Sequence, residues 1–161
     1  MAMSPVGSLP WQVGTALTGL SGGIASGAAP VTSGVFQNPV YTGGFTELSF
    51  TLDLVLTLGT AETATTAGGW VAVALLKYNA LAGPGETPRL NGTQLCPFDG
   101  NRYGQIGIVP SAAYTATEWL TVGNLLVPAS PYLAVAVFNN SSFTIQTTAT
   151  WTPNFNFGGA G

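Results

Sequence analysis

The chain of 161 residues is predicted to be all-β, an antiparallel β-sandwich of jelly-roll-like topology with extended arms at its N- and C-terminal ends. Three observations predict this class. Apolar residues recur at every second position over long stretches, which is the period of a strand. No stretch combines helical periodicity with capping residues. Roughly eight strands separated by turn residues match the strand number of a sandwich or jelly roll.

The alternation is clearest in residues 45–58. From Leu48 to Leu58 every second residue is Leu or Phe, and four of the five residues between them are polar, Asp53 among them. Because successive side chains of a strand point to opposite faces, one face is apolar and the other mostly hydroxylic. The residues expected in the core are Leu48, Phe50, Leu52, Leu54, Leu56, Trp70, Ala72, Val135, Val137, Phe143 and Ile145.

The other expected strands follow from the same pattern. They cover residues 35–41, 69–78, 104–109, 118–122, 125–127, 132–138 and 143–152. Residues 70–76 and 132–138 are apolar on both faces, which predicts central strands covered on both sides. Residues 139–142, Asn-Asn-Ser-Ser, are expected to form the turn of a hairpin between the last two strands. Residues 79–103 form a long expected loop, and such loops are often functional.

Both ends of the chain are expected to lie outside the sandwich domain, which covers 35–153. Residues 1–34 are rich in Gly, Ala, Ser and Pro but also carry large apolar side chains. Glycine leaves too much chain entropy for a stable element. An N-terminal arm that becomes ordered on a neighbouring subunit would explain both the glycine-rich composition and the large apolar side chains. An unstructured terminus is the alternative. The tail, residues 154–161, is interpreted as a second docking arm.

Charge is unusually scarce, at 6 % of residues against roughly 25 % in ordinary soluble domains. Hydroxyls and amides can be buried in an interface without an ionic desolvation penalty. The composition therefore favours a surface that meets other proteins, with a secreted Thr-rich domain as the alternative. Lys77, Arg89 and Arg102 are too few to follow a nucleic-acid backbone. No apolar run is long enough for a membrane-spanning helix, and the first residues lack the features of a secretory signal.

The residue inventory offers little catalytic chemistry. The sequence has no histidine, and Cys96 is the one cysteine, so zinc sites and nucleophile–histidine pairs are not expected. Glu47 and Asp53 share a strand face about 20 Å apart, whereas glycosidase carboxyls lie within about 5 to 10 Å of each other. We therefore expect no enzyme activity, no cofactor and no metal.

The side chains expected to take part in assembly are apolar or aromatic residues of the arms and loops, the types that anchor interfaces. They are Trp11, Leu17, Leu20, Ile24, Tyr103, Trp119, Phe155 and Phe157.

One pattern resembles a known group of proteins. Residues 98–104 read Phe-Asp-Gly-Asn-Arg-Tyr-Gly, residues 106–110 read Ile-Gly-Ile-Val-Pro, and a strand at 131–138 ends in Asn-Asn. This arrangement is similar to small virion proteins of tailed bacteriophages. The resemblance implies a head decoration (cement) protein on the capsid surface, a dimer or trimer that clamps major capsid subunits and has no catalytic residue. A tail, fibre or minor spike component and a carbohydrate-binding β-sandwich module are the alternatives.

Overall fold

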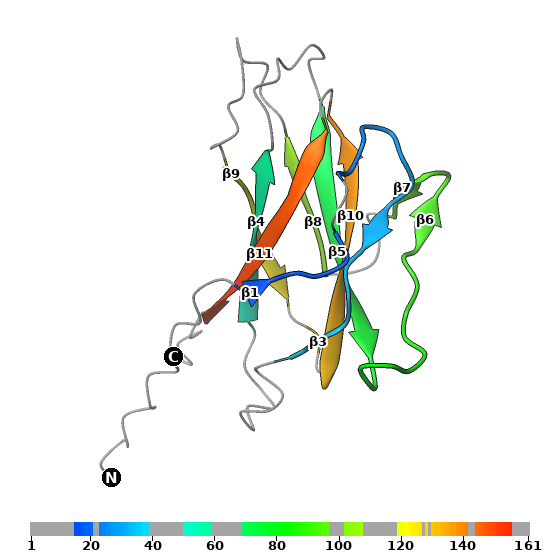
Figure 1. Ribbon diagram of the computed structural model, residues 1–161, viewed down its shortest axis with the longest axis vertical. Coiled ribbons are helices and arrows are strands. Elements are labelled where there is room, and N and C mark those ends of the chain that lie inside the picture. Colours follow the sequence, from blue (N-terminus) through cyan, green and yellow to red (C-terminus); the bar gives the residue numbers. More distant parts are fainter. Residues whose placement is uncertain are drawn as a thin grey trace, which may run out of the picture.

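A computed structural model describes residues 15–20, 23–38, 50–58, 69–96, 102–107, 119–126, 128, 130–141 and 144–155 (Figure 1). Within these ranges the chain forms antiparallel sheets with almost no helix, which confirms the predicted all-β class. None of the helical structure in this part has the length and apolarity to cross a membrane. The strands are β1 (Thr15–Ala16), β2 (Val31–Thr32), β3 (Phe36–Gln37), β4 (Phe50–Leu58), β5 (Trp70–Tyr78), β6 (Leu90–Asn91), β7 (Gln94–Leu95), β8 (Tyr103–Gly107), β9 (Trp119–Leu126), β10 (Tyr132–Asn140) and β11 (Ile145–Phe155).

The strands form two main sheets. The first sheet has the order β1-β11-β4-β9, and the second has the order β2-β10-β5-β8, with β3 also pairing with β10. In Figure 1, β4 and β11 run side by side, as do β5 and β10. Strands β6 and β7 form a separate small hairpin. The two strands expected at 118–122 and 125–127 are one strand, β9, whose register against β4 shifts between Leu52 and Leu54.

The prediction that the last two long strands form a hairpin is wrong. Strand β10 pairs with β5 in the second sheet, whereas β11 pairs with β4 in the first. Asn139, near the end of β10, and Ser141, just after it, are buried instead of forming a solvent-exposed turn. The Asn139 amide donates to Ile24 O at 2.7 Å and its Oδ1 accepts from Ser141 N at 2.9 Å. These bonds hold the chain where it passes from one sheet to the other.

The main core joins the two sheets. Val71, Val73, Leu75, Val135 and Val137 of the second sheet pack in one cluster with residues of the first sheet. The remaining fully buried members of this cluster are Leu17, Leu20, Ile24, Leu125 and Ile145. Alternate residues of β5 and β10 therefore point towards the first sheet, as strand geometry requires.

A second cluster covers the opposite face of β5 and β10. It contains Ala72, Ala74, Leu76, Leu95, Ala134, Ala136 and Phe138. The prediction that these two strands are covered on both faces is confirmed. Trp70 is only partly buried and packs against Phe138 at a ring distance of 5.3 Å. Of the other expected core residues, Leu48 and Phe143 lie outside the described part, as do the side chains of β4.

The N-terminal segment corrects the expected domain boundary. Leu17, Leu20 and Ile24 are 6 %, 2 % and 2 % exposed and lie in the main core. Ile24 and Ile145 exchange two backbone hydrogen bonds, of 2.7 and 3.1 Å. Strand β1 pairs with β11, and β2 pairs with β10. Residues 15–20 and 23–34 thus belong to the domain of their own chain and are not an arm. Residues 1–14 and 21–22 lie outside the described part.

Glycines explain why this segment packs on its own chain despite its composition. Gly19 and Gly23 have φ of 81° and 83°, which other residues rarely adopt. A Cβ at Gly19 would lie 2.8 Å from the backbone nitrogen of Gly34. Leu20, which lies between these two glycines, thereby reaches the core. At the other end, β11 extends to Phe155, which stands opposite Phe50, so 154–155 belong to the strand, while 156–161 are not described.

Candidate interaction surface

Residues 79–96, called here the outer loop, return against the edge of β5. Strand β8 pairs with β5 only from Trp70 to Ala74. Further along β5, Tyr78 pairs with Gly85, and Glu86 N donates to Lys77 O at 2.9 Å. The outer loop thereby continues the sheet where β8 is absent. Gly85 permits this contact, because a Cβ there would lie 2.2 Å from the ring of Tyr78.

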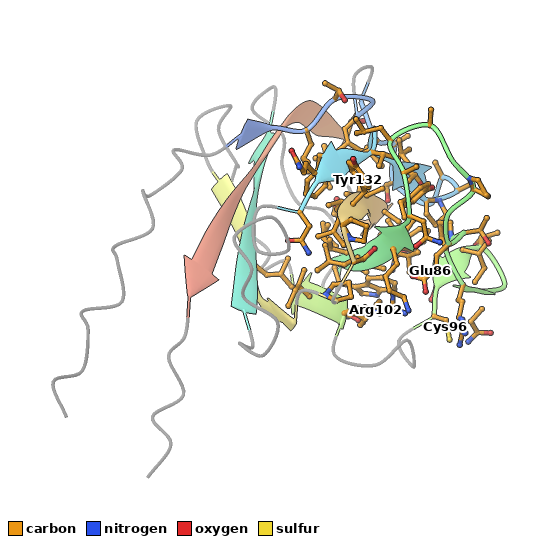
Figure 2. The ribbon with its side chains drawn as sticks, turned by 90° about the horizontal axis from the view of Figure 1, so that it is seen from below. Glu86, Cys96, Arg102 and Tyr132 are labelled. Atoms are coloured by element: carbon orange, nitrogen blue, oxygen red, sulfur yellow. The ribbon has the colours of Figure 1, made fainter. Side chains whose placement is uncertain are left out.

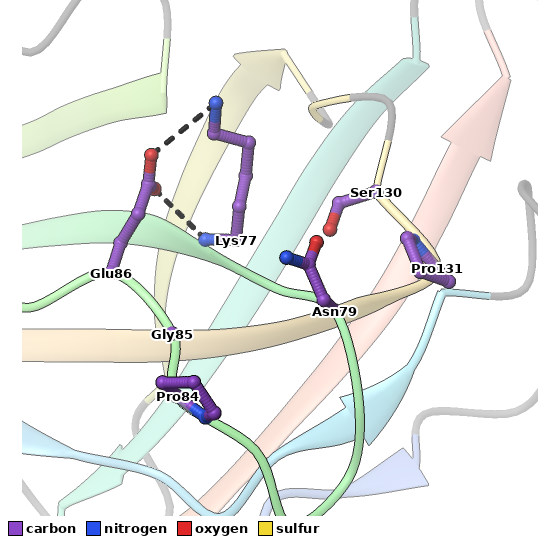
Figure 3. A pocket seen from close by; sticks show the side chains of 7 residues that line it. All are labelled: Lys77, Asn79, Pro84, Gly85, Glu86, Ser130 and Pro131. Atoms are coloured by element: carbon purple, nitrogen blue, oxygen red, sulfur yellow. Dashed lines mark hydrogen bonds and ion pairs between the residues drawn. The ribbon is translucent and has the colours of Figure 1, made fainter.

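Glu86 fixes the outer loop to two other segments. Its Oε2 accepts from Lys77 N at 2.9 Å, and its Oε1 lies 3.3 Å from Lys77 Nζ (Figure 3). Arg102, just before β8, donates from Nη1 to Glu86 Oε2 and to Leu75 O. Burial alone would raise the pKa of Glu86, but the Lys77 N–H, Arg102 and the Lys77 ammonium outweigh it and lower the pKa below 4.5.

The small hairpin β6–β7 anchors the far end of the outer loop. Asn91 stands opposite Gln94, and Gly92 makes the turn with φ of 66°. Leu95 is 2 % exposed and packs into the outer cluster on β5 and β10. Tyr103 packs against the same cluster, and burial, with a further contribution from the nearby Cys96, raises its pKa. The outer loop is therefore held at both ends.

Two large apolar side chains project from this anchored loop. Leu81 is 58 % exposed and Leu90 is 51 % exposed, and no other large apolar side chain is as open among those the structure describes. Figure 2 shows the outer loop on the side of the second sheet away from β4 and β11. Contiguous exposed apolar patches mark interaction sites, whereas single exposed apolar side chains are common on any protein surface.

A groove lies at the base of the outer loop. It has a volume of about 660 Å³ and is lined by Lys77, Asn79, Pro84, Gly85, Glu86, Ser130 and Pro131 (Figure 3). Ser130 Oγ is committed to the backbone, 2.8 Å from Tyr78 O. The exposed Asn79 amide and the Lys77 ammonium, which is 46 % exposed, can reach a ligand. The groove therefore offers hydrogen-bond donors and acceptors beside the apolar rings of Pro84 and Pro131.

The assembly residues expected from the sequence are not gathered at one site. Leu17, Leu20 and Ile24 are in the core and cannot anchor a partner, which corrects that expectation. Tyr103 lies in β8 and is partly buried. Trp119 begins β9 and Phe155 ends β11, but their side chains are outside the described part. Trp11 and Phe157 are also outside it.

Sequence reasoning missed Leu81 and Leu90. The sequence did contain an indication that they are exposed, since both are large apolar residues in a Pro- and Gly-rich segment without strand alternation. Across the described ranges, no group of three or more His, Cys, Asp or Glu side chains could hold a metal. Comparisons with protein-family models, with curated proteins and with solved structures give no match for this chain.

Proposed function

We propose that the chain is a structural virion protein, a capsid decoration (cement) protein with a jelly-roll sandwich that binds across neighbouring major capsid subunits. The strand pairing is the observation that carries this proposal. Apart from β3 and the β6–β7 hairpin, the first described strand pairs with the last (β1 with β11) and the second with the second last (β2 with β10). The series continues inward through β4 with β9 and β5 with β8.

Such nested pairing is expected when one long hairpin rolls into two sheets. This is the jelly-roll arrangement, which is common among viral capsid domains and lectins. The low charge and the exposed leucines of the outer loop add support, since both favour burial against protein. In this role no bond is made or broken. Each copy buries a modest area, and many copies, themselves dimers or trimers, stabilise the shell through avidity.

The test is association with particles. We expect the protein in purified virions in a fixed ratio to the major capsid protein, and the recombinant chain should co-sediment with capsids that lack it. Because few charges are available to pair, binding should persist at about 1 M salt, where the screening length is about 3 Å. Absence from particles, or sharp release by salt, would contradict the proposal. Imaging of labelled particles separates a head position from a tail, fibre or minor spike position.

The groove favours a second candidate, a carbohydrate-binding module. Its volume of about 660 Å³ is that of a small-ligand site. Sugar hydroxyls both donate and accept, which suits the Lys77–Glu86 pair and the Asn79 amide. Retention of the isolated protein on a polysaccharide column, lost in Asn79→Ala, would support this candidate. Gln105 is exposed on β8 and stands opposite Ala72, towards the other end of β5 from the groove residue Lys77, and Gln105→Ala is the control.

A further inference from the structure

The turn of the small hairpin β6–β7 carries the one Asn-Gly step of the chain, Asn91 followed by Gly92. Asn91 is exposed and stands opposite Gln94 at the start of the turn. Gly92 is also exposed and has φ of 66°. A Cβ built on Gly92 would meet no atom within 4 Å beyond its chain neighbours. The backbone nitrogen that follows Asn91 is therefore open to approach, with no side chain in the way.

The hairpin that holds this step is short and lies in solvent. Strands β6 and β7 have two residues each, and both residues of β6 are exposed. One further backbone bond closes the hairpin, from Cys96 N to Arg89 O at 2.8 Å, and Leu95 is its buried anchor. Solvent-exposed backbone bonds with few apolar contacts open locally at a low cost in free energy. Asn91 can therefore leave its strand conformation while the two main sheets stay folded.

The buried or partly buried asparagines that the structure describes are held differently. Asn38 is buried and precedes Pro39, whose nitrogen carries no hydrogen. Asn139 is buried, and its amide donates to a backbone carbonyl. Asn140 precedes Ser141, whose N–H already donates to the Asn139 side chain. At each of these positions the side-chain amide or the nitrogen after it is unsuited to reaction.

Asn79 is the internal reference for Asn91. It is exposed like Asn91 and lies on the same outer loop. The residue after it is Ala80, whose Cβ crowds the backbone nitrogen and restricts the backbone, whereas Gly92 has no Cβ. The two asparagines therefore differ chiefly in the residue that follows.

We propose that Asn91 is a site of spontaneous deamidation in the folded protein, with water as the co-reactant. Gly92 N attacks Cγ of Asn91, so a new N–C bond forms and the bond from Cγ to Nδ2 breaks. Nδ2 leaves as ammonia together with the proton that Gly92 N gives up, and a cyclic imide remains. Water then adds to either imide carbonyl. Opening at Cγ gives aspartate, and opening at the backbone carbonyl gives isoaspartate. Nothing is oxidised or reduced.

Both products change the outer loop. Each places a carboxylate beside the exposed Leu90 and takes the net charge of the chain from −3 to −4. Isoaspartate also carries the chain through its side chain, which lengthens the backbone of β6 just before the turn. The pairing of Asn91 with Gln94 is then out of register, and Leu95 loses the hairpin that turns it onto β5 and β10. The reaction is thus a one-way change in the charge and shape of the outer loop, and it does not depend on the proposed virion role.

The experiment follows the full chain during incubation at constant temperature and slightly alkaline pH, in buffer and in urea. Trypsin cleaves after Lys77, Arg89 and Arg102, and so places Asn79 and Asn91 in different peptides. Mass spectrometry with fragmentation then measures the amide-to-acid exchange at each asparagine, against a sample digested at time zero. In buffer we expect Asn91 to convert at least about tenfold faster than Asn79, which corresponds to about 1.4 kcal/mol in activation free energy.

Two variants test the chemistry and one tests its effect. Gly92→Ala restores a Cβ after Asn91 and should slow conversion to the rate at Asn79. Asn91→Gln, whose longer side chain closes a ring less readily, should stop the conversion without altering the turn glycine. Asn91→Asp carries the new charge on a backbone of normal length. Native trypsin should therefore cut after Arg89 faster in the isoaspartate form of the aged chain than in Asn91→Asp.

The outcomes decide the proposal. Equal conversion at Asn91 and Asn79 in buffer would overturn it. So would conversion of Asn91 that occurs only in urea, because the folded hairpin would then protect the step. Unchanged conversion in Gly92→Ala would refute the role of the glycine. An isoaspartate form that is cut no faster than Asn91→Asp would refute the effect on the hairpin.

Discussion

Leu20→Ala tests whether the N-terminal segment is part of the domain. Leu20 is 2 % exposed and packs in the main core with residues of both sheets. The substitution removes roughly three buried carbon groups at about 0.8 kcal/mol each, or about 2.4 kcal/mol. The cavity that remains adds to this loss, and buried Leu→Ala changes cost about 2 to 5 kcal/mol in total. We expect Leu20→Ala to lower the free energy of unfolding by about 3 kcal/mol.

Urea unfolding followed by circular dichroism measures this loss. With an m-value of about 2 kcal/mol/M, a loss of about 3 kcal/mol moves the midpoint down by about 1.5 M. Leu81→Ala is the matched control, because Leu81 is 58 % exposed and its truncation should change stability by no more than about 0.5 kcal/mol. Equal midpoints for the two variants would refute the reasoning. The segment would then be a detachable arm, as its composition alone indicates.

Two further predictions concern the base of the outer loop. The pKa of Glu86 is lowered by folding, so its carboxylate stabilises the folded state above the unfolded value of 4.5, and this contribution is lost as pH falls through the folded pKa. The urea midpoint should fall in that acidic range, and Glu86→Gln should reduce the fall; an unchanged pH profile would contradict this role. Gly85→Ala should cost about 1 to 3 kcal/mol because the new Cβ meets the ring of Tyr78. Gly107→Ala, which meets no atom within 4 Å, is its control, and equal melting temperatures for the two would be against the predicted clash.

The long strands could be predicted because their pattern is local. Residues 70–76 and 132–138 are apolar throughout and contain valines and aromatic residues, over a length that is typical of a buried strand. Strands β1, β2 and β3 have two residues each, too few to show any period. They form because distant partners offer free edges, as when Thr15 pairs with Trp151. Pairing at such a separation depends on the whole fold and leaves no local signal.

Which leucines of the outer loop are exposed could not be predicted from the sequence for a related reason. The outer loop contains three leucines at 81, 90 and 95, in similar Pro- and Gly-rich surroundings. Leu95 is buried because the β6–β7 hairpin turns it onto the face of β5 and β10, whereas Leu81 and Leu90 stay exposed. Composition could mark the segment as functional, but only its path over the sheet decides which leucine is available to a partner.

The connection from β10 to β11 shows where topology departs from local rules. Asn-Asn-Ser-Ser between two strands favours a hairpin, because short polar turns usually join strands that pair with each other. Here β5 pairs with β10 along its whole length on one side. On the other side β3 and β2 pair with residues 132–133 and 136–137, and beside the turn Asn139 O accepts from Gly27 N at 2.8 Å. With no free edge on β10, the next strand must join the first sheet. Asn139 and Ser141 then use their polar groups for buried bonds across the passage. The nested pairing on which the proposed function rests therefore depends on the short N-terminal strands that fill this edge.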